Sequence, residues 1–147
     1  MSDRKIIRVK DVMKKNFDMV DGLTSVSQVL KKMEHVDNKC LIVDKRHEDD
    51  AYGVVLLSDI AKQVLAKDRA PDRVNVYEIM SKPVITVDQD MDIRYCARLF
   101  EKFGLSRAPV TDGGKIVGIV SLTDLVLKGL CKSINLDRNW KSPYQLK

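Results

Sequence analysis

Several features that assign a chain to a specialised class are scarce in this sequence. Aromatic residues make up 5% of it, and its three cysteines, Cys40, Cys96 and Cys131, form no CxxC pair. No apolar run approaches the roughly 20 residues that a membrane-spanning helix needs. The first ten residues lack the long apolar stretch of a secretory signal. We therefore expect a cytoplasmic, reducing location rather than a disulfide-stabilised or membrane protein.

Basic residues are in mild excess but are not clustered. The chain has 26 Lys and Arg against 21 Asp and Glu, which gives a net charge of +5 at pH 7. Nucleic-acid-binding domains usually cluster basic residues or place aromatic residues among them. We interpret the excess as a solvated surface. Nucleic acid is not an expected partner, although the charge keeps it as a third hypothesis.

Signatures of catalysis and of metal binding are missing as well. The two histidines, His35 and His47, do not have metal-ligand spacing with each other or with a cysteine. The sequence contains no P-loop, no HExxH motif and no recognisable nucleophile–base pair. We therefore expect neither an enzyme nor a metal site.

An internal repeat dominates the sequence. The motif DVM at Asp11–Met13 returns as EIM at Glu78–Met80. The stretch GVVLLSDI, which begins at Gly53, returns as GIVSLTDL, which begins at Gly118. Two copies with the same order of motifs predict two similar structural units. We place a first repeat with its lead-in at 1–66, a linker at 67–75, a second repeat at 76–130 and a tail at 131–147.

Each repeat is predicted to form a strand, a helix, two strands and a second helix. Apolar residues recur at i, i+3, i+4 and i+7 from Val26 and again from Ile93, which is typical of an amphipathic helix. We expect Ser25 and Asp90 to cap these helices, and Gly104 to end the second one. An Asp-Gly-Gly turn before the last strand of the second repeat predicts a hairpin. The expected fold class is therefore α+β.

The polar residues of GIVSLTDL have a structural and a functional interpretation. Asp124 follows a strand, and the helix dipole favours a carboxylate in the first turn of a helix. An ionised carboxylate there could also accept hydrogen bonds from both hydroxyls of a ribose. Ser121 at a strand end is ordinarily part of a turn, and Thr123, next to the helix, is the better N-cap candidate. Ligand binding and helix capping both stay open at this point.

The doubled pattern resembles a tandem pair of CBS domains, also called a Bateman module. The most specific pieces are DVM and EIM, the strand SRAPV, the turn DGGKIVGIV and the SLTDL that follows it. The resemblance implies two pseudo-symmetric repeats that often assemble into a disc-shaped homodimer. It also implies clefts that commonly bind AMP, ADP, ATP or S-adenosylmethionine, with no obligatory cofactor.

From this resemblance we expect a stand-alone regulatory module that signals ligand binding to an unidentified protein partner. The alternative is a ligand-free dimerisation or interaction scaffold whose sites are degenerate. Arg107 is expected to reach phosphates, with a solvated strand-end arginine as its alternative. Ala108 and Pro109 are expected beside the base, and Thr86 at an adenine edge. The ligand contacts implied in the second repeat are Asp124, Ser121, Thr123, Arg107, Ala108, Pro109 and Thr86.

The first repeat departs from the pattern at the hydroxyl. Leu56 stands at the position of Ser121, and an apolar side chain cannot hydrogen-bond a ribose or a phosphate. Asp59 is kept, and Ser58 could supply the missing hydroxyl. The first-repeat site is therefore expected to be weaker, differently filled or empty.

Aligning KCLIVD with RAPVTD completes the comparison of the two repeats. The alignment puts Lys39 at the position of Arg107 and Leu41 at the position of Pro109. Lys39 is then the candidate phosphate contact of the first repeat.

Overall fold

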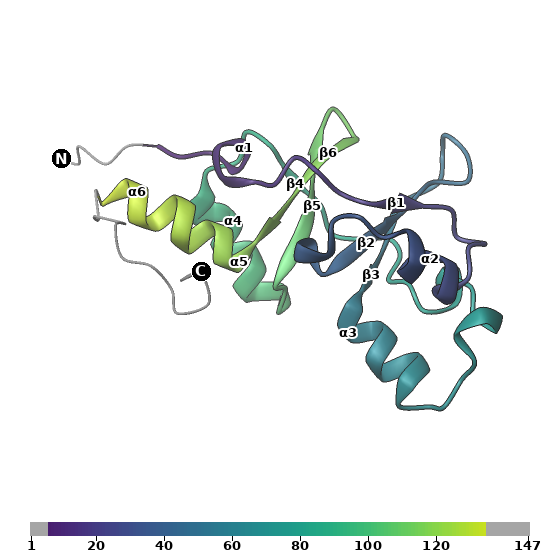
Figure 1. Cartoon of the computed structure of the whole chain (residues 1–147). Coiled ribbons are helices and arrows are strands. Elements are labelled where there is room, and N and C mark those ends of the chain that lie inside the picture. The colour runs from purple at the N-terminus through teal and green to yellow at the C-terminus, as the bar shows by residue number, and fades with distance from the viewer. Residues whose placement is uncertain (1–5, 135–147) are drawn as a thin grey trace. The chain divides into compact units, whose positions relative to one another are not determined.

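The computed structural model describes residues 6–134 and divides them into two compact units (Figure 1). The inner unit is Lys14–Thr86. The terminal unit combines the described parts of 1–13 and 87–147. The start of the predicted lead-in, 1–5, and most of the predicted tail, 135–147, lie outside the described residues.

The inner unit is built on a three-stranded mixed sheet. Strand β1 (Met19–Val20) pairs in parallel with β2 (Cys40–Val43), which pairs antiparallel with β3 (Gly53–Leu56). The helices are α2 (Val26–Lys32) and α3 (Leu57–Ile60), and α3 continues into the π-helical segment η2 (Ala61–Leu65). Three short 3-10 helices complete the unit: η1 (Val36–Asn38), η3 (Pro71–Arg73) and η4 (Val76–Glu78).

The terminal unit repeats this topology. Strand β4 (Val87–Asp88) pairs in parallel with β5 (Arg107–Asp112), which pairs antiparallel with β6 (Lys115–Ser121). Gly113 and Gly114 form the hairpin between β5 and β6 with φ of 59° and 84°, as the Asp-Gly-Gly turn predicted. The helices are α1 (Val9–Val12), α4 (Ile93–Phe103), α5 (Leu122–Asp124), the π-helical segment η5 (Leu125–Leu130) and α6 (Cys131–Ser133).

The predicted α+β fold with a strand, helix, strand, strand, helix order is confirmed in both repeats. The first strand of each repeat is short. Only two residues of β1 and two of β4 pair with the neighbouring strand. The chain turns at the end of each pairing, where Asp21 accepts from the Leu23 N–H and Asp88 accepts from the Asp90 N–H.

Two of the three predicted helix boundaries are confirmed. The Ser25 hydroxyl accepts a hydrogen bond from the Gln28 N–H at 3.2 Å, and Gly104 ends α4 with φ of 64°. The prediction of Asp90 as the second N-cap is wrong. The N-cap is Asp92, because α4 begins two residues later than expected and the Asp92 carboxylate accepts from the Arg94 N–H at 2.8 Å. Asp90 forms an ion pair with Lys10 instead.

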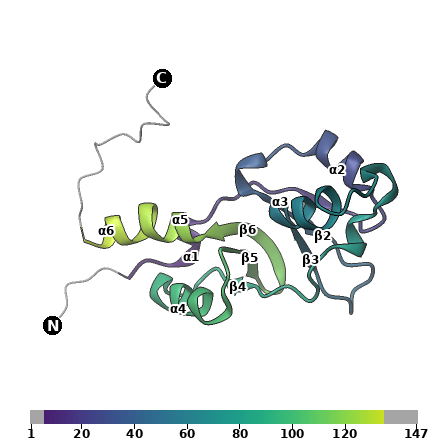
Figure 2. The ribbon, with the colours of Figure 1, turned by 90° about the horizontal axis from the view of Figure 1, so that it is seen from below.

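The motifs DVM and EIM, which begin the two repeats and are here called the lead-in motifs, are exchanged between the units: each packs with the strands of the other repeat. The helix α1, which carries DVM, lies in the terminal unit with the second-repeat strands, beside η5 in both views of the ribbon (Figures 1 and 2). The segment η4, which includes the first residue of EIM, lies in the inner unit with the first-repeat strands. Two equivalent backbone hydrogen bonds hold each motif: Val9 N–Met91 O (2.8 Å) and Lys10 N–Gln89 O (2.9 Å), and Val76 N–Thr24 O (2.9 Å) and Tyr77 N–Gly22 O (3.0 Å).

Each unit has its own apolar core, to which the exchanged motif contributes. In the terminal unit Val9 and Val12 pack with Phe100, which is completely buried. In the inner unit Val76 packs with Leu41 and Val55. Burying one such side chain contributes about 1.5–3 kcal/mol. The motifs therefore stabilise the unit in which they lie.

The three cysteines are buried and form no disulfide. Burial raises the pKa of the Cys96 thiol to about 11. The neutral thiol is therefore the form present near pH 7, and Cys96 behaves as a small core residue.

Candidate functional site

The turn from β6 into α5 is held by Ser121 and Asp124, which satisfy each other's polar groups. The Ser121 hydroxyl accepts from the Asp124 N–H at 3.1 Å and donates to Asp124 Oδ2 at 3.0 Å. The Ser121 N–H donates to the same Oδ2 at 3.3 Å. Both residues are buried. These bonds form a capping box, which fixes the orientation of the carboxylate.

The structure shows the capping interpretation directly and corrects one detail of it. Ser121, and not Thr123, is the N-cap, because the backbone of Ser121 is still extended and α5 begins at Leu122. Thr123 is the second residue of the helix and is exposed. A ligand role for either residue stays a prediction.

The other oxygen of Asp124 has a looser partner. Lys128, four residues along the helix, places its Nζ 3.5 Å from Asp124 Oδ1, and the lysine side chain is 46% exposed. Lys128 is not among the residues predicted from the sequence, although the i, i+4 spacing of Asp and Lys on a predicted helix is a visible signal. The carboxylate therefore has one oxygen fixed by the turn and one in a weak, solvated ion pair.

Arg107 lies directly across the sheet from Ser121. The two residues are a pair in the antiparallel ladder between β5 and β6. Side chains of such a pair stand on the same face of a sheet, so Arg107, Ser121 and the attached Asp124 are brought together at one end of the hairpin. Arg107 is half-buried, and its Nε lies 3.4 Å from the Ser106 hydroxyl.

Three further residues are predicted ligand contacts. Ala108 and Pro109 follow Arg107 in β5 and are buried, and Ala108 belongs to the core of the terminal unit. Thr86 immediately precedes β4 and is half-buried. Their ligand roles stay predictions.

The equivalent turn in the first repeat keeps only half of the capping box. Asp59 Oδ2 accepts from the Leu56 N–H at 2.9 Å, as Asp124 does from Ser121. Leu56 has no side-chain acceptor to return the bond. Ser58 is the second residue of α3, so it corresponds to Thr123 and does not replace the hydroxyl of Ser121 in the cap.

The ladder register corrects the alignment of the second strands. Cys40 pairs with Leu56 as Arg107 pairs with Ser121, so Cys40 stands at the position given to Lys39. Lys39 precedes β2, has φ of 59° and is exposed. By the same register, the residue of the first repeat that is equivalent to Pro109 is Ile42 and not Leu41.

The spacing before the terminal aspartates explains this error. Arg107 lies five residues before Asp112, whereas Cys40 lies four residues before Asp44. The register shift of the β5–β6 ladder places its extra residue, Val117, in β6 and does not lengthen β5. Aligning the repeats on their terminal aspartates, Asp44 and Asp112, therefore displaces the start of the strand by one residue.

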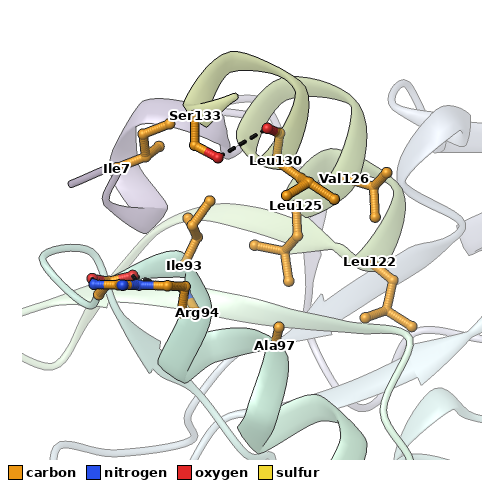
Figure 3. Close-up of a pocket in the computed structure, with 10 residues that line it drawn as sticks. Ile7, Ile93, Arg94, Ala97, Leu122, Leu125, Val126, Leu130 and Ser133 are labelled. Carbon is orange, nitrogen blue, oxygen red and sulfur yellow. Dashed lines mark hydrogen bonds and ion pairs between the residues drawn. The ribbon is translucent and has the colours of Figure 1, made fainter. Parts of the chain in front are cut away.

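An apolar groove of about 210 Å³ lies elsewhere in the terminal unit, between α4 and the helical run from α5 to α6 (Figure 3). In Figure 3 the side chains of Ile93 and Ala97 face Leu125 and Leu122 across it. At its edge the Arg94 guanidinium donates to Asp92, which lowers the pKa of that carboxyl. The groove is bordered by a row of half-exposed aliphatic residues at intervals of four, which we call the aliphatic stripe: Leu122, Val126, Leu130 and Ile134.

The described part of the chain contains neither a cluster of metal-ligating side chains nor a membrane-spanning helix. Among residues 6–134 no group of three or more His, Cys, Asp or Glu side chains could hold a metal ion. Over the same residues no helix is long and apolar enough to span a bilayer.

Comparison with known families identifies the fold and its repeats. Residues 9–66 and 76–129 match the CBS domain family. The chain therefore belongs to the CBS domain family and contains a pair of these domains, as its doubled motifs indicated.

Two of the curated relatives are archaeal proteins that are longer than the matched region. The chain is 34% identical over 104 residues to the uncharacterized protein MK0525 of Methanopyrus kandleri, covering 70% of this chain and 52% of that protein. It is 33% identical over 116 residues to the uncharacterized protein MJ0450 of Methanocaldococcus jannaschii, covering 78% and 62%. The chain thus spans little more than half of the length of these relatives.

Solved structures of CBS proteins share the fold. A hexameric CBS-CP12 protein from bloom-forming cyanobacteria is 35% identical, with a TM-score of 0.80 over 86% of this chain and 73% of that one. The CBS domain pair of protein MJ0100, in complex with 5′-methylthioadenosine and S-adenosyl-L-methionine, is 27% identical. Its TM-score is 0.71 over 87% of this chain and 99% of that one.

Proposed function

We propose that the chain is a regulatory module that binds an adenosine-containing ligand and signals to a protein partner. The observation that carries this proposal is the cluster at one end of β5 and β6, where Arg107 lies opposite Ser121 and Asp124 is bonded to Ser121. An oriented carboxylate suits ribose hydroxyls, and a guanidinium suits phosphate oxygens. The complex of the similar MJ0100 domain pair with two adenosine derivatives supports the ligand class.

The two oxygens of Asp124 have different parts in this proposal. Oδ2 is occupied by the Ser121 hydroxyl and N–H, which keeps the helix cap intact. Among residues 6–134, the contact of Oδ1 is the one with Lys128 at 3.5 Å. A ribose hydroxyl donating to Oδ1 therefore displaces a weak ion pair and leaves the capping box in place.

Two ligands separate the roles of Asp124 and Arg107. AMP and 5′-methylthioadenosine share the adenosyl group, but only AMP carries a phosphate. Isothermal titration of Arg107→Met should show weakened AMP binding and unchanged 5′-methylthioadenosine binding. Asp124→Asn should weaken both ligands. If Arg107→Met lost affinity for both ligands to the same extent, Arg107 would not be a phosphate contact.

A homodimer is the second part of the proposal. The aliphatic stripe leaves Leu122, Val126, Leu130 and Ile134 between 43% and 55% exposed. Contiguous exposed apolar surface of this kind marks an interaction site. The similar CBS-CP12 protein is hexameric, which supports self-assembly as a property to test in this chain.

In the first repeat, the residues at the equivalent site favour the alternative function, a scaffold that binds no ligand. Leu56 removes the hydroxyl, and the residue opposite it is Cys40 rather than a cation. We therefore expect at most one strong adenosyl site per chain, with Asp59, Ser58 and Lys39 making a weak site or none. We also infer that the protein acts by binding rather than by catalysis, in a reducing compartment such as the cytoplasm, where cysteines remain reduced.

A further inference from the structure

A cavity of about 660 Å³ lies in the inner unit at the carboxyl ends of β1 and β2. This is the opposite end of the sheet from Leu56, which pairs with the first residue of β2. Carboxyl ends of adjacent parallel strands are common ligand positions, and cavities of this size hold small molecules. A polar hollow of about 140 Å³ adjoins it, and the two share Asp21, Gly22, Asp44, Lys45 and Arg46.

Two carboxylates form one side of the cavity. Asp21 and Asp44 directly follow Val20 and Val43, which are partners in the parallel ladder. Each carboxylate uses Oδ1 in a local turn, accepting from the Leu23 N–H at 2.8 Å and the Lys45 N–H at 2.7 Å respectively. Among the described residues neither carboxylate forms an ion pair. This side of the cavity suits a cationic group such as an ammonium.

Cations form another side. Lys82 places Nζ 2.7 Å from Asp50 Oδ1, and Arg46 places Nε 3.2 Å from Asp50 Oδ2. One carboxylate thus faces two cations and holds both in position. Lys45 lies over the Tyr52 ring, with Nζ 5.0 Å from its centroid. These side chains leave a net positive charge that suits a carboxylate.

The remaining wall is apolar and open to solvent. Leu23 is 74% exposed and Tyr77 is 49% exposed. Gly22 allows Tyr77 to lie against the turn, because a Cβ at Gly22 would be 3.3 Å from the Cβ of Tyr77. Met80 completes this wall. An apolar group of a ligand would cover surface that the unit itself leaves exposed.

We propose that this cavity binds a free α-amino acid with an apolar side chain. The ammonium lies at Asp21 and Asp44, and the carboxylate lies at Lys45 and Lys82. The side chain packs on the wall formed by Leu23, Tyr77 and Met80. A zwitterion fits because a ligand of a single charge leaves one of the charged walls unmatched. The proposal does not depend on the adenosyl site at Asp124.

The test is isothermal titration of the full chain with L-phenylalanine and L-methionine. Two analogues of phenylalanine isolate the charges: 3-phenylpropionate lacks the ammonium, and phenethylamine lacks the carboxylate. We expect saturable heat with at least one amino acid, and binding of each analogue weaker by about tenfold or more, as expected for loss of a charge-assisted hydrogen bond. No saturable heat with either amino acid at millimolar concentration overturns the proposal, as does an analogue that binds as tightly as phenylalanine.

Matched variants locate the site. Asp21→Asn and Asp44→Asn remove the charge and keep an oxygen for the turn hydrogen bond, and thermal unfolding checks that each is folded. Asp88→Asn is the control, because Asp88 is the counterpart of Asp21 in the second repeat, accepts from the Asp90 N–H at 2.8 Å and lies outside the cavity.

We expect Asp21→Asn and Asp44→Asn to lose binding of the free amino acid, and Asp88→Asn to bind it as the wild type does. Asp124→Asn should also bind it normally, which separates this site from the adenosyl site. Normal binding by both cavity variants places the amino acid elsewhere and overturns the assignment.

Discussion

At the scale of single residues, the turn after β6 depends on the side chains of Ser121 and Asp124. Each of them hydrogen-bonds the other and so stabilises the start of α5. The Ser121 hydroxyl accepts from the Asp124 N–H, and Asp124 Oδ2 accepts from both the Ser121 N–H and the Ser121 hydroxyl. A buried backbone N–H that loses its partner is costly. The same residues are therefore under a structural constraint whether or not a ligand is bound.

Replacing Ser121 by Ala should destabilise the protein by about 1 kcal/mol, the usual cost of losing an N-cap side chain. Thr123→Ala should change the free energy of unfolding by less than about 0.5 kcal/mol, because Thr123 is exposed and caps nothing. Urea unfolding of both variants checks the difference. A larger loss in Thr123→Ala than in Ser121→Ala would contradict the assignment of the N-cap.

The ionisation of Asp50 should make the stability of the fold depend on pH, with a direction that follows from its pKa. The hydrogen bond from Lys82, and then that from the Arg46 N–H, lowers the pKa of Asp50 well below its ordinary value of 3.8. A lowered pKa in the folded state means that the ionised carboxylate stabilises the protein above pH 3.8, and that this contribution declines as the pH falls further.

Asp50→Asn should therefore flatten the acid limb of the stability profile below about pH 4, where carboxylates ordinarily titrate. Thermal unfolding between pH 2 and pH 7 measures this, with Asp49→Asn as the control. An acid limb as steep in Asp50→Asn as in the wild type would show that the ion pairs with Lys82 and Arg46 do not stabilise the fold.

At the scale of elements, the terminal unit requires a close approach between η5 and α4. A Cβ at Gly129 would lie 2.6 Å from Ile93 Cδ1, which is closer than packed carbon atoms allow. The nearest atom is the end of a side chain, so shortening that side chain should relieve the contact. Gly129 is therefore the residue that sets this helix packing.

Gly129→Ala should destabilise the protein by about 1–3 kcal/mol through overpacking, reduced by the higher helix propensity of Ala. Ile93→Val alone should cost about 0.5–1.5 kcal/mol. The double variant should be more stable than the sum of the two changes implies, because Val lacks the clashing Cδ1. Strict additivity in a urea double-mutant cycle would show that the two residues are not in contact.

The element order and most turns could be predicted from the sequence, because apolar periodicity and glycine turns are local signals. The cap at Asp92 could not, since Asp90 and Asp92 are equally good capping residues and only the start of α4 decides between them. The position of Cys40 opposite Leu56 could not either, because β5 has one more residue than β2 before its terminal aspartate, and aligning the two aspartates hides this difference. The exchange of the lead-in motifs is a tertiary feature with no local signal.

At the scale of the whole molecule, the aliphatic stripe is the feature that the proposed homodimer explains. Val126→Asp places a charge in the middle of the stripe and should convert the dimer to a monomer of 16.7 kDa in light scattering after size-exclusion chromatography. Lys132→Asp, on the same helical run but outside the stripe, is the control. A wild-type monomer, or a Val126→Asp variant that remains dimeric, would contradict the dimer through this surface.

The most direct test of the central claim is isothermal titration of AMP and 5′-methylthioadenosine into the wild type, Asp124→Asn and Asp11→Asn. Asp11 is a matched control, because its carboxylate also accepts a capping hydrogen bond, from the Arg8 N–H at 2.9 Å. We predict that the wild type and Asp11→Asn bind a ligand and that Asp124→Asn, while folded, does not. Absence of binding to the wild type, or equal binding to all three proteins, would show that Asp124 only caps its helix.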